Sequence, residues 1–538
     1  MAANIVPQKV EDVDTQALSP MMQQYLEIKR QHPNEILFYR VGDFYEMFFD
    51  DALTASRELE LTLTGKACGL PDRAPMCGVP FHSYEIYAAR LIAKGYKVAI
   101  CEQMEDPALA KGLVKRDIIR VITPGTVIES SMLADDKNNY ICSIYTRKVR
   151  SRWKAGICFA DISTGEAYAT ELTAEKMGPA IITELCRYMP SEILINPALL
   201  DLKEVTNYVR QHTHALVELR EDACYQQRVM EDAMTAQFGA DWRNTCGFAQ
   251  DGLVPYAFGA LLGYLHETQK HGIDRIKSVQ NYADAQYMRL SPVTRANLEL
   301  TETMRGREKR GTLLWVLDKT ETSMGKRQLR AWIEQPLVDS RAINQRLDAV
   351  EALYNANVTR ADLKEALSHV YDIERLTTRI LYGSATPKEV KALGDTCVYL
   401  PQVRQLARQC TTPLLQELSG AVDPLEDLLD LINRALVEDP PANLKDGGAI
   451  RAGYNAEVDE LRDIMHGGKG FLSQLEAKLK EETGIPKLKI GFNKVFGYYI
   501  EVSRSYAASV PDTFIRKQTL TTGERYITPE LKELENKI

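Results

Sequence analysis

Residues 38–52 of the chain read FYRVGDFYEMFFDDA. An extended apolar run that starts at Ile36 meets the pair Gly42-Asp43, and a helical pattern follows. This pattern predicts a strand before the glycine and a helix over residues 43–60. An aromatic ring and a carboxylate would then lie on the first turn of that helix, close to the surface.

The ring and the carboxylate belong to Phe44 and Glu46, and two interpretations are open. In the structural one, Asp43 caps the helix and Glu46 completes a capping box three residues later. Phe44 and Phe48 would then pack together in the core at i, i+4 spacing. In the functional one, both side chains point outward to a ligand. The residues alone favour the structural interpretation.

The bulk composition is that of a globular protein with several domains. The 538 residues are too many for one core and predict three to five domains. No run of 18 apolar residues and no secretory signal is present, so we expect no membrane span. Ten cysteines without a C-x-x-C pair fit a reducing cytoplasm. A formal charge of −8 argues weakly against nucleic acid, but local basic surface decides such binding.

Patterns along the chain change in a definite order. Helical and extended patterns alternate over residues 19–130, and strands restart near residue 135 in a second α/β region. Apolar residues then recur at spacings of three and four from about 285 to 437, which indicates an all-helical region. A long helix is predicted from about 455 to 482, followed by strands over residues 484–505. A final helical pattern has no C-cap at its end, which predicts a fragment of a longer protein.

Motifs for nucleotide hydrolysis and metal binding are weak or absent. A phosphate loop needs G-x-x-x-x-G-K-[S/T], and the nearest match, residues 306–312, lacks the Lys-Ser/Thr pair. We therefore expect neither a catalytic residue, a bound cofactor nor a metal site in this chain. One alternative is a metal-dependent nuclease that uses Asp161 in the first strand of the second α/β region, with Glu166 and Glu184. The competing interpretation is that these are hairpin and helix-surface acids.

Several segments resemble one family, and they occur in that family's order. The stretch over residues 20–52 resembles the start of bacterial DNA mismatch repair proteins of the MutS family, whose mismatch-reading motif is F-x-E within G-D-F-Y-E. The resemblance extends over nearly the whole chain and is carried further by AICEQMEDP (99–107), RVITPGT (120–126), FADISTGE (159–166), DGGAIRAGYNAEVDELR (446–462), GFNKVFGYYIEVS (491–503) and ERYITPELKELE (524–535).

The resemblance implies a multidomain α/β plus all-α fold. Its parts are a mixed α/β mismatch-binding domain, an RNase H-like α/β connector that is not a nuclease, and a long-helix core and lever domain with an inserted β-rich clamp. The expected ranges are a tail over 1–18, the mismatch-binding domain over 19–130, the connector over 131–270, the core and levers over 271–445, the clamp over 446–520, and the start of a returning lever helix over 521–538.

Carried over by the resemblance, Phe44 is the wedge that enters a mismatch and Glu46 is the acid that contacts a base. Glu46 would act either as a protonated donor, which we favour for purines, or as an ionised acceptor. Basic stretches are expected to grip the DNA backbone. The candidate backbone contacts are Lys487, Lys489, Asn493, Lys494, Arg516 and Lys517 in the clamp, and Lys111, Lys115 and Arg116 nearer the N-terminus.

The resemblance also implies partners and a location. We expect binding to double-stranded DNA with mispaired bases and small loops, and a MutL-type repair partner. Longer members would use ATP and Mg²⁺ and form homodimers, whereas this chain would be monomeric or weakly associated. The expected location is the cytoplasm of a bacterium, associated with the nucleoid.

Overall fold

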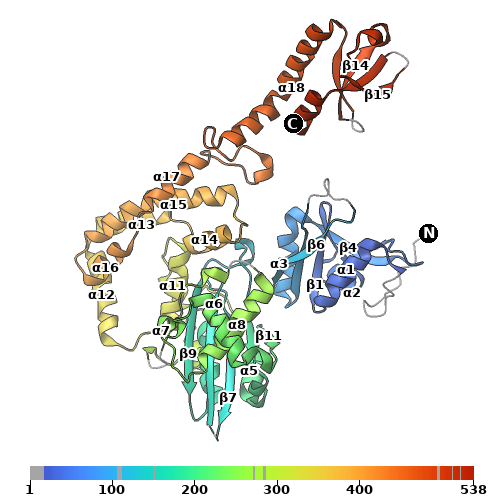
Figure 1. Cartoon of the computed structure of the whole chain (residues 1–538). Coiled ribbons are helices and arrows are strands. Elements are labelled where there is room, and N and C mark those ends of the chain that lie inside the picture. The colour runs from blue at the N-terminus through green and yellow to red at the C-terminus, as the bar shows by residue number, and fades with distance from the viewer. Residues whose placement is uncertain are drawn as a thin grey trace. The chain divides into compact units, whose positions relative to one another are not determined.

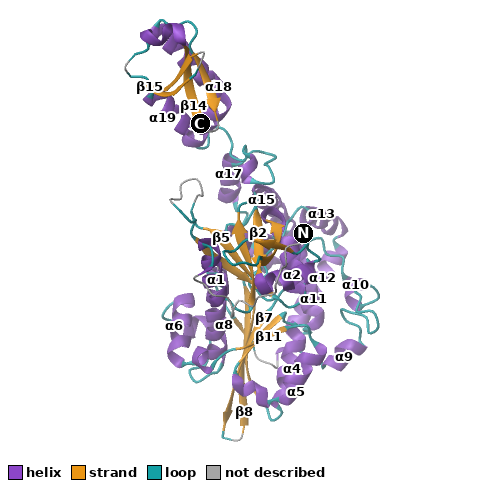
Figure 2. Cartoon of the chain, turned by 90° about the vertical axis from the view of Figure 1, so that its right-hand side faces the viewer, coloured by secondary structure: helices purple, strands orange, loops and turns teal. Residues whose placement is uncertain are grey.

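The computed structural model describes residues 17–105, 112–150, 152–270, 273–282, 286–493, 497–511, 513–520 and 523–537. By its internal contacts the chain divides into two compact units, Met1–Glu426 and Asp427–Ile538. Figure 1 traces their elements in chain order, and Figure 2 shows that helices and strands mix in both.

A mixed six-stranded sheet near the N-terminus has the order β3-β4-β2-β1-β5-β6. In this sheet β1 and β5 are parallel, and the other neighbouring strands are antiparallel. Helix α1 packs on one face, and α2 and α3 pack on the other. The bounds are β1 Glu35–Val41, β2 Phe44–Phe48, β3 Thr64–Lys66, β4 Ala74–Pro80, β5 Lys97–Gln103, β6 Arg116–Ile122, α1 Pro20–Gln31, α2 Phe49–Leu59 and α3 Tyr84–Ala93.

The helix predicted over residues 43–60 is wrong in its first third. Residues Phe44–Phe48 form strand β2, which pairs with β1 through the two-residue connection Gly42-Asp43. Gly42 has a φ of +57°, the left-handed backbone that such hairpin turns require at a central position. Over five residues, alternating burial and helical spacing look alike in sequence. The predicted capping box and the Phe44–Phe48 core pair are therefore also wrong.

Buried charges fix where the helix after this hairpin begins. Asp51 in the first turn of α2 pairs with Lys29 of α1 at 2.9 Å, and both side chains are buried. The backbone N–H of Leu37 donates to the same carboxylate at 3.0 Å. Burial raises the pKa of Asp51, and Lys29 opposes that rise. Because a buried charge needs its partner, this pair holds α1 and α2 to opposite faces of β1 in one register.

A second six-stranded sheet follows, with the order β11-β10-β7-β8-β9-β12. Helices α4 and α5 cover one face, and α6, α7 and α8 cover the other. The predicted hairpin around residues 163–165 is present as β8 and β9. The bounds are β7 Ile141–Val149, β8 Arg152–Asp161, β9 Glu166–Thr173, β10 Glu192–Ile195, β11 Leu216–Leu219, β12 Gln280–Asn281, α4 Met177–Tyr188, α5 Lys203–His212, α6 Gln227–Phe238, α7 Trp242–Cys246 and α8 Val254–Gln269.

The remaining part of the first unit is helical, as the apolar spacing predicts. Helix α17 crosses the division between the two units. The bounds are α9 Pro292–Asn297, α10 Leu313–Leu317, α11 Ser323–Glu334, α12 Ser340–Asn355, α13 Asn357–Ser368, α14 Ile373–Leu381, α15 Pro387–Arg408, α16 Pro413–Ala421 and α17 Glu426–Ala435.

The second unit joins a long helix to a small antiparallel sheet. The helix is α18, Ala456–Thr483, close to its predicted bounds. Leu475 and Leu479 on this helix pack with Ile500 and Val502 of the sheet, whose strand order is β13-β14-β16-β15. The other bounds are β13 Lys489–Asn493, β14 Gly497–Ser503, β15 Ile515–Thr519, β16 Gly523–Ile527 and α19 Pro529–Lys537.

The fold class predicted from the sequence is confirmed: two mixed α/β regions precede a helical region and a β-containing unit. One detail is wrong, because Asp161 ends the second strand of its sheet and β7 precedes that strand. Among the residues that the structure describes, no helix is both long and apolar enough to cross a membrane.

A pair of glycine substitutions tests the packing of α8 against the second sheet. A Cβ on Gly156 of β8 would come within 2.3–2.5 Å of backbone atoms of Leu253 and Val254. We expect Gly156→Ala to lower the free energy of unfolding by about 1–3 kcal/mol or more, because backbone cannot move aside cheaply. Urea denaturation of the whole chain measures the change.

Gly263→Ala is the matched control within α8. A Cβ there meets no atom within 4 Å, so this variant should gain about 0.5–1 kcal/mol from helix propensity. Equal stability of the two variants would contradict the packing described here.

Candidate nucleic-acid interface

Phe44 is an exposed aromatic ring on a firmly held hairpin. It is the first residue of β2 and pairs with Val41 of β1 and Pro80 of β4, so its backbone has a strand on each side. The N–H of Phe81 donates to the carbonyl of Asp43 at 3.0 Å and ties the turn to β4. The Phe44 residue is nevertheless 48% exposed. A large apolar side chain that is rigidly placed and left in water is a candidate for contact with a ligand.

Glu46 lies on the same side of the sheet as Phe44, because side chains alternate along a strand. Its carboxylate accepts a hydrogen bond from Nζ of Lys66 in β3. The side chains of Glu46 and Lys66 are 17% and 28% exposed. The predicted pair of functional residues is therefore brought together on one face, although by a strand and not by a helix.

The opposite side of β2 is anchored in the core. Tyr45 is buried, and its hydroxyl donates to the carboxylate of Glu102. Burial and this acceptor raise the pKa of Tyr45 well above its usual value, so the hydroxyl stays protonated. Arg40 pairs with Glu102 at 3.1 Å, and its guanidinium lies 3.6 Å from the ring centroid of Phe81. These contacts hold the hairpin from beneath and leave Phe44 as its projecting group.

The basic stretch between β5 and β6 is less available than its sequence indicates. Lys115 is exposed, but Arg116 is buried and donates to the carbonyls of Arg40 and Val114 at 2.7 and 3.0 Å. Because those donors already serve the protein's own backbone, we do not retain Arg116 as a contact to DNA. Lys111 lies outside the described residues.

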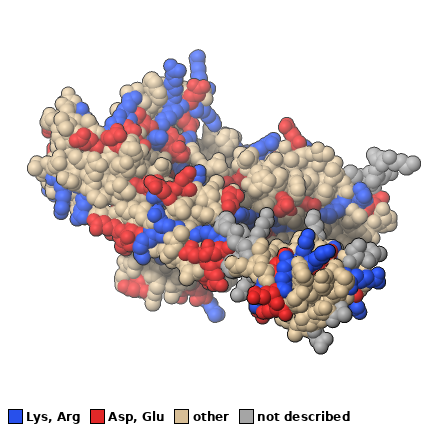
Figure 3. Space-filling view, turned by 90° about the horizontal axis from the view of Figure 1, so that it is seen from above, with Lys and Arg blue, Asp and Glu red and all other residues tan. Residues whose placement is uncertain are grey.

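In the second unit, the exposed basic candidates are Lys487, Lys489, Arg516 and Lys517. Nη1 of Arg516 lies 3.4 Å from Oε1 of Glu524, and Lys489 is opposite Glu501 in the pairing of β13 with β14. Acidic residues therefore lie next to these basic residues. Figure 3 shows positive and negative side chains interspersed over the visible face of the molecule. Asn493 ends β13 with its side chain partly buried, and Lys494 lies outside the described residues.

The carboxylates of the nuclease alternative are occupied by donors from the chain itself. Asp161 accepts from the N–H groups of Ser163 at 2.9 Å and Asn139 at 3.0 Å. Glu184 pairs with Arg187 at 3.0 Å and accepts from the hydroxyl of Tyr282 at 2.5 Å, all within the core. Within the described ranges, no group of three or more His, Cys, Asp or Glu residues could hold a metal ion. The arrangement therefore gives no support to a two-metal nuclease.

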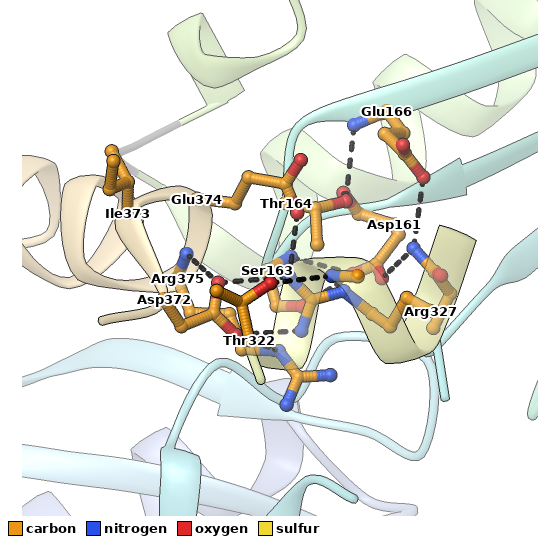
Figure 4. A network of polar contacts seen from close by, with 12 residues as sticks. Asp161, Ser163, Thr164, Glu166, Thr322, Arg327, Asp372, Ile373, Glu374 and Arg375 are labelled. Carbon is orange, nitrogen blue, oxygen red and sulfur yellow. Dashed lines mark hydrogen bonds and ion pairs between the residues drawn. The ribbon is translucent and has the colours of Figure 1, made fainter. Parts of the chain in front are cut away.

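Glu166 lies instead in a buried polar junction, which Figure 4 shows between the β8–β9 hairpin and helices α11 and α14. Asn138 donates to its carboxylate at 2.9 Å. Burial, with Glu374 and Asp161 nearby, raises the pKa of Glu166 to about 7. In the same junction the guanidinium group of Arg327 forms an ion pair with the carboxylate of Glu374 at 2.6 Å. Glu166, which the nuclease alternative uses as a metal ligand, thus belongs to a junction that joins the β8–β9 hairpin to the helical region.

The raised pKa of Glu166 predicts how stability depends on pH. The neutral acid is favoured in the fold, so its contribution is complete below pH 4.5 and is lost as pH rises through about 7. Glu166→Gln stays neutral and should remove this slope. At pH 8 the variant should be more stable than the parent by roughly 1–3 kcal/mol, since one pKa unit corresponds to about 1.4 kcal/mol.

Thermal unfolding from pH 4 to pH 8 measures this difference between the two proteins. If the unfolding temperatures of the parent and of Glu166→Gln changed in parallel with pH over the whole range, the raised pKa of Glu166 would be contradicted.

Two parts of this site were missed by the sequence reasoning. Lys66 cannot be predicted from the sequence, because it lies 20 residues from Glu46 and nothing local links them. The support from Arg40 and Glu102 was also missed, since it needs the parallel neighbour β5 beside β1. The alternation of Tyr45 and Met47 in β2 was the one signal available in the sequence.

Comparison with known proteins identifies the family. Models of MutS domain I, domain II and domain III match residues 19–131, 139–280 and 293–531. Curated relatives named DNA mismatch repair protein MutS include those of Ruminiclostridium cellulolyticum and Acetivibrio thermocellus, each 48% identical over 97% of this chain. The relative from Clostridium perfringens is 47% identical over 97% of the chain.

The chain covers 59%, 59% and 56% of the lengths of these three relatives. It therefore spans less than two thirds of the proteins that it matches. Together, the three successive domain models and the identity over almost the whole chain show that it belongs to the MutS family.

Proposed function

We propose that this chain senses mispaired bases and small insertion or deletion loops in duplex DNA by wedging Phe44 into the defect. The observation that carries the proposal is a ring 48% exposed at the start of a strand that is hydrogen-bonded on both sides. A wedge must be apolar, must project, and must not retreat when it is pushed against stacked bases. Phe44 on β2 meets these three requirements.

Selectivity then comes from the cost of deforming the duplex. A mispaired step has lost part of its pairing and stacking, so it opens at a lower cost than a matched step. Stacking of a base on an aromatic ring contributes about 1–3 kcal/mol. A kink costs about 1–6 kcal/mol and is cheapest where the duplex is already flexible. One ring can therefore recognise many different defects.

Glu46 adds a polar contact beside the ring. Strand alternation places it two residues further along on the face of Phe44, so both can meet one base step. It would donate as the protonated acid or accept as the carboxylate, and we favour donation to purines. Glu46→Gln keeps a donor without charge. If this variant folds normally and loses mismatch preference, donation by Glu46 is wrong.

General affinity must come from phosphate contacts, because a neutral ring carries no long-range attraction. The exposed lysines of the second unit and Lys115 of the first are the retained candidates. Such contacts hold the duplex without reading its sequence. Affinity and selectivity therefore rest on different residues, and substitutions should separate them.

The activity of the longer protein is proposed from the family resemblance alone. We expect longer members to bind ATP with Mg²⁺, to hydrolyse it, and to assemble as homodimers with a MutL-type partner. For this chain alone we propose weak, salt-sensitive DNA binding as a monomer or a loose associate. The nuclease alternative has no geometric support in the part of the chain that the structure describes.

Replacing the ring tests the wedge. We expect Phe44→Ala to reduce the preference for mismatched over matched duplex by about five- to 150-fold, the factor that corresponds to losing 1–3 kcal/mol of stacking. Affinity for matched DNA should change little, because phosphate contacts remain. Fluorescence anisotropy titrations with a G·T duplex and its matched counterpart at fixed salt give both numbers.

Ile86→Ala is the control, since Ile86 in α3 is 64% exposed in the same domain and has no part in the hairpin. A Phe44→Ala protein that keeps the full preference would refute the wedge.

The phosphate contacts are tested by the dependence of binding on salt. We expect Lys487→Gln, Lys489→Gln and Lys517→Gln together to weaken binding to matched and mismatched duplexes alike. The slope of log affinity against log salt should fall by up to about 0.9 for each lysine that neutralises a phosphate.

Neutralising Lys203, Lys277 and Lys319, which are exposed in the first unit, is the charge-matched control. Equal slopes for the two triple variants would exclude the second unit as a specific backbone contact.

A further inference from the structure

The proposed function does not explain the ion pair between Glu46 and Lys66, which lies beside the exposed ring. Lys66 is the last residue of β3, the edge strand of its sheet, and its Nζ donates to Oε2 of Glu46. Both side chains are partly exposed. The pair therefore lies where solvent, or a ligand that replaces solvent, can reach it.

The strand between the two residues leaves room for this pair. β4 separates β2 from β3, and its residue opposite Glu46 is Gly78. A Cβ there would lie 3.7 Å from Cγ of Glu46 and 3.2 Å from the carbonyl oxygen of Tyr45. A larger side chain at Gly78 would crowd the Glu46 stem. The bare backbone allows the carboxylate to lean across the sheet toward β3.

The ammonium group of Lys66 has a second favourable contact. Its Nζ lies 5.4 Å from the ring centroid of Phe48, the residue that follows Glu46 on the same face of β2. A cation near a ring face is stabilised by the ring's quadrupole. Lys66 is thus attracted both to the carboxylate of Glu46 and to the core ring of Phe48, and these two contacts hold the ammonium over the sheet.

We propose that Lys66 is a positioning residue for Glu46, and that it holds the carboxylate on the protein until a base defect takes the carboxylate away. This inference rests on the proposed function. In the free protein the pair neutralises an acid that would repel phosphates. At a defect Glu46 leaves Lys66, takes up a proton from solvent where it acts as the donor, and turns to the base. The pair opens at small cost, because partly exposed ion pairs are weak.

Glu46 exchanges Lys66 for a base only at a defect. Loss of Lys66 should therefore change the affinity for matched and mismatched duplexes by different amounts. On matched DNA Glu46 finds no base to contact, so without Lys66 its bare carboxylate stays beside phosphates and weakens binding. On mismatched DNA the base satisfies Glu46, so the same substitution weakens binding less. Removal of Lys66 therefore raises selectivity while it lowers affinity. A lysine that only ties β3 to β2 would lower stability without this difference.

A double-mutant cycle on the whole chain tests the proposal. The proteins are the parent, Lys66→Met, Glu46→Gln and the double variant, each titrated with G·T and matched duplexes by anisotropy at one salt concentration. We expect Lys66→Met to raise the mismatch-to-match affinity ratio by about threefold, the scale of a partly exposed ion pair. In the Glu46→Gln background the same substitution should leave the ratio unchanged. Lys66→Arg should restore the parent ratio.

Each result has a defined meaning. A parent protein without any preference contradicts the proposed function, and with it the role of Lys66. A parent with a clear preference whose ratio is unaffected by Lys66→Met overturns the role of Lys66 alone. A change in ratio of equal size in both backgrounds also overturns it, because the effect would not pass through Glu46. Thermal unfolding of all variants identifies any loss of fold.

Discussion

The hairpin between β1 and β2 is the constraint on which the candidate interface depends. Gly42, with its φ of +57°, closes a two-residue connection, so the next residue enters a strand at once. That geometry places Phe44 at the end of the sheet and Glu46 beside it on one face. If the segment were helical, residues 44 and 46 would point in directions about 200° apart, and they could not meet one base step.

Buried side chains beneath the hairpin hold the strand that carries the exposed ring in place. Tyr45 and Met47 alternate into one core while Phe48 enters the other, so β2 is fixed from both sides of its sheet. The Lys29–Asp51 pair holds the helices on those two sides in register. A ring on a loose loop would yield before a stacked base does. The proposed function therefore depends on rigidity supplied by residues buried beneath Phe44.

The sequence was sufficient for the order of regions but not for the site's geometry. The helical region and long helix α18 follow from apolar spacing sustained over many turns, and hairpin β8–β9 follows from its turn residues. The strand around Phe44 was misread because five residues do not distinguish a period of two from 3.6. Arg116 looked like a surface cation until β6 placed it against Arg40. Pairs such as Glu46 and Lys66 are created by strand order, which single-sequence patterns do not contain.

If the hairpin ring selects DNA by deforming it, the duplex must bend where the ring enters. The measurement is energy transfer between dyes at the two ends of a short duplex, with and without one mispair, at saturating protein. We expect a shortened end-to-end distance for the mispaired duplex and a nearly unchanged one for the matched duplex. Selective binding to a mispaired duplex that remains straight would contradict it.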